Sequence, residues 1–246
     1  MKYLVTNLKS HFDKNEMDLY LESLKRIPKN EYELIVCPSA IFMNGMDLEN
    51  CTLGCQDVSK FASGSYTGEI SARQYRSVGC KYAIIGHYER RNNFHDDSTT
   101  ISKKIRNAFD AGMKVIYCIG ESLNDLKNNE VMYSLENQIG TVLNDFTHDE
   151  IKNIIIAYEP LWSIGSNKIP EMNTIKGTIK FIKNLIHDYY DLDLDILYGG
   201  SINRANIILL RNIKEIDGFI IGASSLEIKE LERIIKLTQV DKNRQL

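Results

Sequence analysis

Residues 82–119 read YAIIGHYERRNNFHDDSTTISKKIRNAFDAGMKVIYCI, and this stretch decides the fold class. It opens and closes on short apolar runs, Tyr82–Gly86 and Lys114–Ile119, in which apolar residues follow one another instead of alternating with polar ones. Such runs are typical of parallel strands that are buried on both faces. Between them, Thr100–Ala111 carries apolar residues at helical spacing. The stretch therefore predicts a strand, a helix and a second strand parallel to the first.

The same alternation extends to both ends of the chain. The other apolar runs are Tyr3–Thr6, Glu33–Cys37, Thr52–Gln56, Ile154–Glu159, Asp195–Tyr198 and Gly218–Ile221. Further helical patterns occupy Asp18–Arg26, Thr174–Tyr189 and Ser225–Leu237. Eight strand–helix units in a chain of this length are typical of the α/β class and of the (β/α)8 barrel in particular.

An open doubly wound sheet is the alternative arrangement of such units. That fold usually carries a glycine-rich turn after its first strand, whereas residues 6–10 here read TNLKS. No linker or change of composition divides the chain. The sequence therefore predicts a single-domain (β/α)8 barrel that spans residues 1–246.

Composition excludes several classes of protein. The 246 residues carry 30 Lys and Arg against 33 Asp and Glu, a net charge of −3, which argues against a binder of nucleic acid or anionic membranes. No apolar run is long enough to span a membrane, and the polar residues from Thr6 onward do not fit a signal peptide. Five cysteines without a Cys-x-x-Cys pair favour reduced thiols. We therefore expect a cytoplasmic protein.

Polar residues follow three of the predicted strands at the point where each strand ends. Asn7 and Lys9 follow the first, His87 the fourth, and Glu159 ends the sixth. Active sites of (β/α)8 barrels lie at this end of the strands. A carboxylate at the end of a buried strand is costly unless it has a partner or a role. The sequence thus predicts a site at the carboxyl ends of the strands.

Two turns of small residues follow the last two strands, GGS at 199–201 and GASS at 222–225. Backbone N–H groups in such turns form anion sites, and barrels commonly bind phosphate at these two loops. A phosphate there, with a carboxylate, an imidazole and a lysine nearby, suits the isomerisation of an aldose and a ketose phosphate. The carboxylate would move a proton between adjacent carbons while the cationic and neutral donors stabilise an enediolate.

Over essentially its whole length the sequence resembles the triosephosphate isomerase family. The matching stretches are NLK at 7–9, GSYTGE at 64–69, GHYERR at 86–91, CIGE at 118–121, AYEPLWSIG at 157–165 and YGGS at 198–201. The resemblance implies interconversion of dihydroxyacetone phosphate and D-glyceraldehyde 3-phosphate, with a small phosphorylated sugar as substrate. We expect neither a cofactor nor a metal, because a proton shift between adjacent carbons needs only an acid, a base and stabilisation of charge. By position, it implies that Glu159 is the base and His87 the neutral electrophile. Asn7 and Lys9 would bind substrate oxygens, and Glu89 would pair with Lys9.

The resemblance also implies a mobile loop, a phosphate grip and a partner subunit. The loop would begin at Pro160, Leu161 and Trp162, with its tip at Ser163, Ile164, Gly165 and Ser166. The phosphate would be held by N–H groups of Gly165, Ser201, Gly222 and Ala223, while Ile164 and Ile220 cover Glu159. Thr67 would reach the site of a second subunit, which implies a homodimer.

The chain departs from the family pattern at several positions. Tyr88 follows His87 where the family has serine, and its ring either turns outward under the loop or holds Glu159 toward the substrate; we expect the first. Ser39 replaces a second proline, Asp57 replaces an asparagine, and residues 165–168 read GSNK where the family has GTGK. None of these changes removes a catalytic group.

Three other hypotheses remain open at this point. The chain could isomerise a longer phosphosugar, such as a tetrose phosphate, or bind phosphate without useful catalysis. His95, Asp96 and Asp97 could hold a metal, although a solvated loop is the preferred interpretation.

Overall fold

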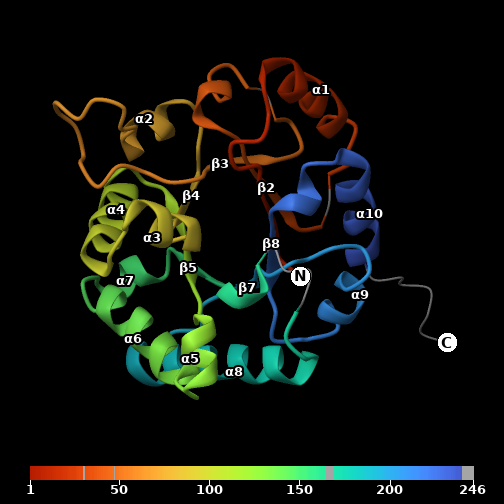
Figure 1. Cartoon of the computed structure of the whole chain (residues 1–246). Helices are drawn as coiled ribbons and strands as arrows, with labels where there is room; N and C mark the ends of the chain where they lie inside the picture. Colours follow the sequence, from red (N-terminus) through yellow and green to blue (C-terminus); the bar gives the residue numbers. More distant parts are fainter. Residues whose placement is uncertain (30, 47, 165–168, 240–246) are drawn as a thin grey trace.

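The structure is a computed structural model, and it describes residues 1–29, 31–46, 48–164 and 169–239. Eight parallel strands pair in sequence order and close into a barrel, with β8 beside β1 (Figure 1). The strands are β1 (Tyr3–Asn7), β2 (Glu33–Cys37), β3 (Thr52–Cys55), β4 (Tyr82–Ile85), β5 (Lys114–Ile119), β6 (Ile154–Tyr158), β7 (Ile196–Tyr198) and β8 (Gly218–Ile221). The predicted barrel is confirmed, and each strand lies within two residues of its expected bounds.

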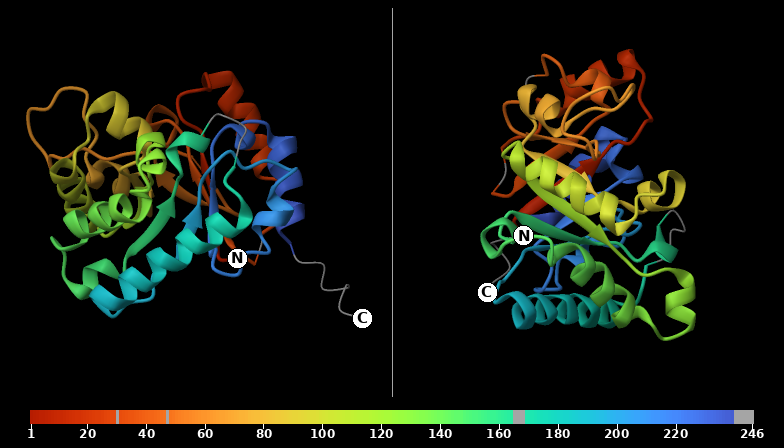
Figure 2. Two further views of the ribbon diagram at one scale, coloured as in Figure 1. Left: turned by 60° about the horizontal axis from the view of Figure 1, so that its bottom comes forward. Right: turned by 90° about the vertical axis from the view of Figure 1, so that its left-hand side faces the viewer.

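Helices cover the outside of the barrel on all sides (Figure 2). They are α1 (Lys14–Leu24), α2 (Ala72–Ser77), α3 (Tyr88–Phe94), α4 (Ser98–Asp110), α5 (Leu123–Lys127), α6 (Val131–Leu143), α7 (His148–Ile151), α8 (Met172–Tyr190), α9 (Ile207–Leu210) and α10 (Ile228–Thr238). Short 3₁₀ turns form η1 (Ala40–Phe42), η2 (Leu161–Ser163) and η3 (Ala223–Ser225).

The helices expected from periodicity are present with shifted ends. α1 begins four residues before the expected Asp18, because Asp13 caps it: the Asp13 carboxylate accepts the N–H of Glu16, and the Glu16 carboxylate accepts the N–H of Asp13. The helix expected from Ser225 begins at Ile228 instead, because the preceding residues form η3. Caps and turns, which carry no apolar period, set these boundaries.

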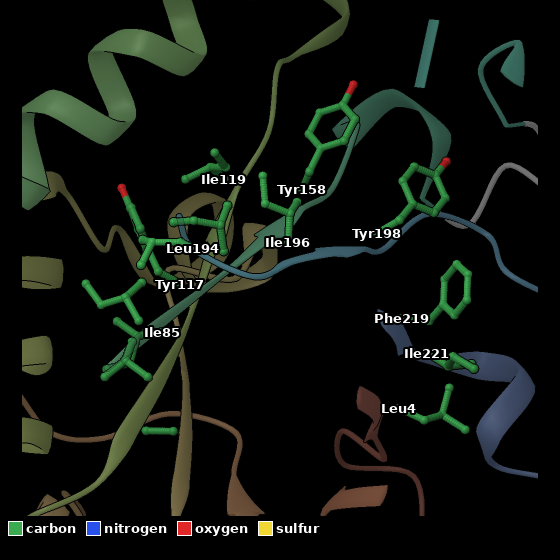
Figure 3. Close-up of a cluster of buried hydrophobic side chains, with 14 of the residues drawn as sticks. Leu4, Ile85, Tyr117, Ile119, Tyr158, Leu194, Ile196, Tyr198, Phe219 and Ile221 are labelled. Carbon is green, nitrogen blue, oxygen red and sulfur yellow. The ribbon is translucent and has the colours of Figure 1, made fainter. Parts of the chain in front are cut away.

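Side chains along the strands alternate between two hydrophobic clusters. One cluster, drawn in part in Figure 3, lies between strands and helices and contains Tyr117, Tyr158 and Tyr198. The other contains strand residues that face the barrel interior, among them Val5 and Ala157. Because side chains alternate along each strand, the residues two positions further on lie on the interior side as well. This period places Asn7 and Glu159 at the mouth of the barrel.

Candidate active site

The carboxyl ends of the strands surround a cavity of about 200 Å³. Its walls are formed by Asn7, Lys9, His87, Tyr88, Glu159, Ile164, Gly199, Gly200, Ser201, Ile202, Asn203, Ile220, Gly222, Ala223 and Ser224. The structure thus brings the four residues expected to be catalytic into one cavity. The expected phosphate-binding residues line the same cavity, as far as the structure describes them. These residues come from loops after strands that are far apart in sequence, as in other (β/α)8 barrels.

Glu159 is the most enclosed charged group of the cavity. Its side chain is only 5% exposed, and its backbone N–H donates to the carbonyl of Ile119 at 2.8 Å. Its carboxylate lies against Gly199, where an added methyl group would come within about 3 Å of both Cγ and Oε1. Burial raises the pKa of Glu159, and the neighbouring His87 side chain opposes that rise. Burial thus makes the carboxylate a stronger base than one in water.

His87 occupies the position that caps the first turn of α3. Its Nδ1 accepts the N–H of Glu89 at 3.4 Å, and its Nε2 lies 3.6 Å from Oε1 of Glu159. Because an accepting Nδ1 carries no proton, the neutral ring has its proton on Nε2. The geometry therefore presents a donor N–H to the cavity beside the Glu159 carboxylate.

Lys9 is held in an unusual backbone conformation, with φ of 52°. Its N–H donates to Oδ1 of Asn7 at 3.2 Å, and its carbonyl accepts from Oγ of Ser39 and Nε2 of Gln56, each at 2.8 Å. A non-glycine residue at positive φ costs about 1 kcal/mol or more. The Lys9 ammonium reaches back to Oε1 of Glu89 at 2.5 Å, so the predicted ion pair is present.

Ser39 and Gln56 are therefore supporting residues that the sequence did not identify. In the sequence, Ser39 is noted only as a departure from the family pattern, and Gln56 only as the last residue of the apolar run Thr52–Gln56. Each follows the end of a strand, β2 and β3, and that position was the available signal. Their shared contact with the Lys9 carbonyl depends on how the strand ends meet.

The turn after β7 is tied to the start of the loop after β6. Ser201 has a φ of 41°, and its Oγ donates to the carbonyl of Ser163 at 2.5 Å. The Ser201 carbonyl accepts from the side-chain amides of Asn203 and Asn206, at 3.3 and 3.0 Å. At Gly200 an added methyl group would come within 2.8 Å of Ser163 Oγ. Small residues here therefore allow the two loops to touch.

The turn after β8 completes the far wall of the cavity. Gly222 precedes η3, and an added methyl group there would lie 3.5 Å from Cε of Lys9. Ala223 is exposed at the cavity mouth. The predicted loop-tip residues Gly165 and Ser166 lie outside the residues that the structure describes.

The first part of the loop after β6 is anchored to a buried carboxylate. Glu121 Oε1 accepts the indole N–H of Trp162 at 2.8 Å, and the Glu121 carbonyl accepts the N–H of Leu161 at 3.0 Å. Glu121 is 2% exposed, and burial raises its pKa. Pro160 is buried, while Ile164 turns into the cavity. These contacts fix the starting point of the loop relative to Glu159.

Gly120 is the tightest glycine position beside the site. A methyl group added to it would lie 1.8 Å from the carbonyl oxygen of Glu159. We predict that Gly120→Ala forces the ends of β5 and β6 apart, costs about 1–3 kcal/mol of unfolding free energy and lowers kcat. Gly140→Ala is the matched control, since a methyl group there meets nothing within 4 Å, and it should stabilise the protein by about 0.5–1 kcal/mol. Urea unfolding and turnover of both variants test this; equal behaviour would refute it.

The Tyr88 ring does not turn out of the site as expected but lies on the cavity wall. Its centroid is 5.0 Å from the His87 ring, and Nζ of Lys9 is 5.9 Å from the same centroid. The ring is half-buried at the first position of α3. The helix start directs the side chain back over the preceding turn, toward the strand ends.

Thr67 is not part of the cavity of its own chain. It lies on the loop before α2, which projects from the barrel in Figures 1 and 2. The segment 62–69 is exposed throughout, and within the loop the rings of Phe61 and Tyr66 stack at 3.6 Å.

The segment His95–Asp97 is only in part the solvated loop that the sequence suggested: His95 and Asp97 are exposed, but Asp96 is not. Asp96 is 6% exposed, and one of its oxygens lies 2.6 Å from Nζ of Lys104. Asp97 caps α4 by accepting the N–H of Thr100 at 2.7 Å. Within the described ranges, no group of three or more His, Cys, Asp or Glu side chains is arranged to hold a metal. Nor does any helix of the described part have the length and apolarity to span a membrane.

Comparison with known proteins assigns the family. The profile of the triosephosphate isomerase family matches residues 2–238. A triosephosphate isomerase of Orientia tsutsugamushi (strain Ikeda) is 36% identical to this chain over 96% of the chain and 97% of its own length. One of Alkaliphilus oremlandii (strain OhILAs) is 32% identical, covering 90% and 93%, and one of Geotalea uraniireducens (strain Rf4) is 35% identical, covering 84% and 86%. The chain belongs to the triosephosphate isomerase family.

Proposed function

We propose that the protein interconverts dihydroxyacetone phosphate and D-glyceraldehyde 3-phosphate, as an aldose–ketose isomerase. The observation that carries this proposal is the enclosed Glu159 carboxylate, which lies 3.6 Å from Nε2 of His87 in the cavity that also contains Lys9. A buried base, a neutral donor and a cation are what a proton shift between adjacent carbons requires. The family assignment supports the same reaction.

The geometry supports a distinct role for each group. Glu159 takes a proton from one carbon of the substrate and returns it to the neighbouring carbon. The reaction also moves a proton from the hydroxyl oxygen of the substrate to the former carbonyl oxygen: Nε2 of His87 gives its proton to the carbonyl oxygen and takes up the proton of the hydroxyl, while the Lys9 ammonium stabilises the negative charge that develops on both oxygens. The side-chain amide of Asn7, beside Lys9, supplies a further contact. No redox partner is needed, because the electron pair stays within the substrate and Glu159 returns the proton that it takes.

The opposite end of the cavity suits the phosphate. Small residues after β7 and β8, with Ser201, Gly222 and Ala223 among them, bring backbone groups to the cavity wall. Ile164 and Ile220 add apolar surface near Glu159, which favours exclusion of water when substrate is bound. We propose that these residues hold the phosphate and cover the base. We extend the phosphate grip to Gly165 on the family pattern.

An assay with both triose phosphates tests the function. We expect rapid isomerisation in both directions, and turnover of erythrose 4-phosphate lower by orders of magnitude, since the three relatives are all named for the triose substrate. Comparable turnover of the tetrose phosphate would favour a longer substrate. Binding of inorganic phosphate without any turnover would favour a phosphate-binding barrel.

We further propose a homodimer built through the loop that carries Thr67. The loop projects from the barrel, and its residues 62–69 are all exposed, so a second molecule can reach them. A second copy of this chain is the proposed partner, and Thr67 would approach its Asn7 and Lys9.

We predict that Thr67→Arg weakens the dimer and lowers activity, because a long charged side chain cannot be buried at an interface without a partner. Sedimentation velocity at micromolar concentration, together with turnover, tests this. Tyr133→Arg on α6 is the matched control, since Tyr133 is 72% exposed on another part of the surface, and it should leave both measurements unchanged. A fully active wild-type monomer would contradict the proposal.

We also propose a cytoplasmic location. All five cysteines are free, and Cys37, Cys55, Cys80 and Cys118 are buried. Burial raises the pKa of Cys118, so that thiol stays protonated and packs as a small apolar group. Thiols kept in this form suit a reducing compartment.

A further inference from the structure

Tyr88 lies close to two groups of the proposed reaction, His87 and Lys9. Its ring centroid is 5.0 Å from that of His87, and Nζ of Lys9 is 5.9 Å from the same centroid. The two planes of Tyr88 and His87 are tilted by 43°, so the rings meet at an angle and are not stacked. Tyr88 also lines the cavity, whereas its neighbour Glu89 does not.

The Lys9 side chain needs such a neighbour. Its ammonium stands at the end of a long flexible chain that is 24% exposed, and among the described residues Glu89 is its one ion-pair partner. A single contact of this kind leaves a lysine free to rotate about it. An aromatic face within about 6 Å of an ammonium attracts it without competing for its N–H groups. Those N–H groups therefore stay available to a substrate.

The ring is suited to this role because it is uncharged. Burial raises the pKa of the Tyr88 phenol, and the carboxylates of Glu89 and Glu159 raise it further. The phenol is therefore neutral at physiological pH, and it adds no negative charge to a site that must bind a phosphorylated anion.

We propose that Tyr88 is a positioning residue that acts through Lys9: its ring holds the ammonium over the cavity beside His87. This inference rests on the proposed function in one respect: it assumes that the Lys9 ammonium contacts the substrate. The contact belongs to this chain, because the family pattern has a serine at the position of Tyr88, and a serine presents no aromatic face.

Three substitutions distinguish the effect of the aromatic face of Tyr88 from the effects of its apolar bulk and of its hydroxyl group. Tyr88→Phe keeps the aromatic face, Tyr88→Leu keeps the apolar bulk but removes the face, and Tyr88→Ser removes both. We expect kcat/KM with D-glyceraldehyde 3-phosphate to stay within about twofold in the Phe variant. It should fall by about two- to thirtyfold in the Leu and Ser variants, the range that a cation–π contact spans. Wild-type activity in Tyr88→Leu would overturn the proposal.

A double-mutant cycle tests whether Tyr88 acts through Lys9. The measurement is the Kd of glycerol 3-phosphate, a phosphate ester that lacks a carbonyl group, by calorimetry for the wild type, Tyr88→Leu, Lys9→Met and the double variant. We expect Tyr88→Leu to weaken binding in the wild-type background and to have little effect in Lys9→Met. Equal effects in both backgrounds would show that the ring acts independently of Lys9 and would refute the proposal.

This cycle also separates failure of the inference from failure of the proposed function. If the wild type does not isomerise triose phosphates, the proposed function is wrong, while the binding cycle still reports the coupling between Tyr88 and Lys9. If the wild type is active and the cycle shows no coupling, the inference alone is wrong. Thermal unfolding of each variant identifies any that does not fold; should Tyr88→Leu be one, Tyr88→Ser takes its place in the cycle.

Discussion

Glu159→Gln is expected to lower kcat about a thousandfold or more while KM changes by a small factor. The amide has the shape of the carboxylate but cannot accept a proton from carbon, and general-base catalysis contributes about a hundred- to ten-thousandfold. The cavity wall at Ser201, Gly222 and Ala223 is unchanged in the variant, so the phosphate should still bind. Steady-state kinetics in both directions measure the effect. Near-normal turnover would show that the base lies elsewhere.

The same substitution should raise stability at neutral pH. Burial raises the pKa of Glu159 in the folded state, which means that folding disfavours its charged form. The cost is absent below the unfolded pKa of about 4.3, grows as the pH rises toward the folded pKa, and is complete above it. Urea unfolding of wild type and Glu159→Gln at pH 7 and near pH 4 tests this: the variant should be the more stable at pH 7, and the difference should shrink at the lower pH.

The catalytic efficiency should change with pH in the opposite direction to the stability of the wild type. Because a protonated Glu159 cannot act as a base, kcat/KM should decline as the pH falls below the raised pKa. His87, Cys118 and Lys9 limit the rise in that pKa, since each favours the charged carboxylate. Burial of the Glu159 carboxylate therefore costs free energy of folding and, because it raises the pKa, also makes the carboxylate a stronger base.

The barrel and the position of Glu159 could be predicted because both depend on local periods. Apolar runs without alternation identified the strands. Because side chains of a strand alternate with a period of two residues, Glu159 lies on the same side as Ala157, which faces the barrel interior. Positions of this kind are set by the strand that carries them. Residues that follow a strand directly, such as His87, are nearly as well determined.

Contacts between different strand ends could not be predicted in the same way. Gly120 looks like any glycine in the sequence, and its 1.8 Å clearance from the Glu159 carbonyl depends on how β5 and β6 converge. Asp96 was expected in solvent, yet it is buried against Lys104, because α3 and α4 bring the two together. The contact between Tyr88 and Lys9 likewise joins two residues that are far apart in sequence. Tertiary packing decides all of these.

The Lys9 side chain gives the second large effect. Lys9→Ala is expected to lower kcat/KM about a hundred- to thousandfold, since removing one preorganised charge or donor from developing oxyanions has that effect in other enzymes. Stability should change by only about 1 kcal/mol or less, because Lys9 and Glu89 are both partly exposed and water can solvate the remaining carboxylate. Alanine at position 9 would adopt the same positive φ as Lys9, so the backbone strain is unchanged.

A second lysine provides the control for this prediction. Lys14 pairs with Asp18 on α1 and is 70% exposed, so Lys14→Ala removes the same charge without touching the cavity. Its kcat/KM should equal that of the wild type, which would exclude a general effect of net charge on the approach of an anionic substrate. If Lys9→Ala also kept its activity, the positive charge for the enediolate would have to come from elsewhere. Arg90 and Arg91 do not line the cavity, and Lys9 is the one lysine or arginine of the described residues that does. The loss of activity should therefore be specific to Lys9.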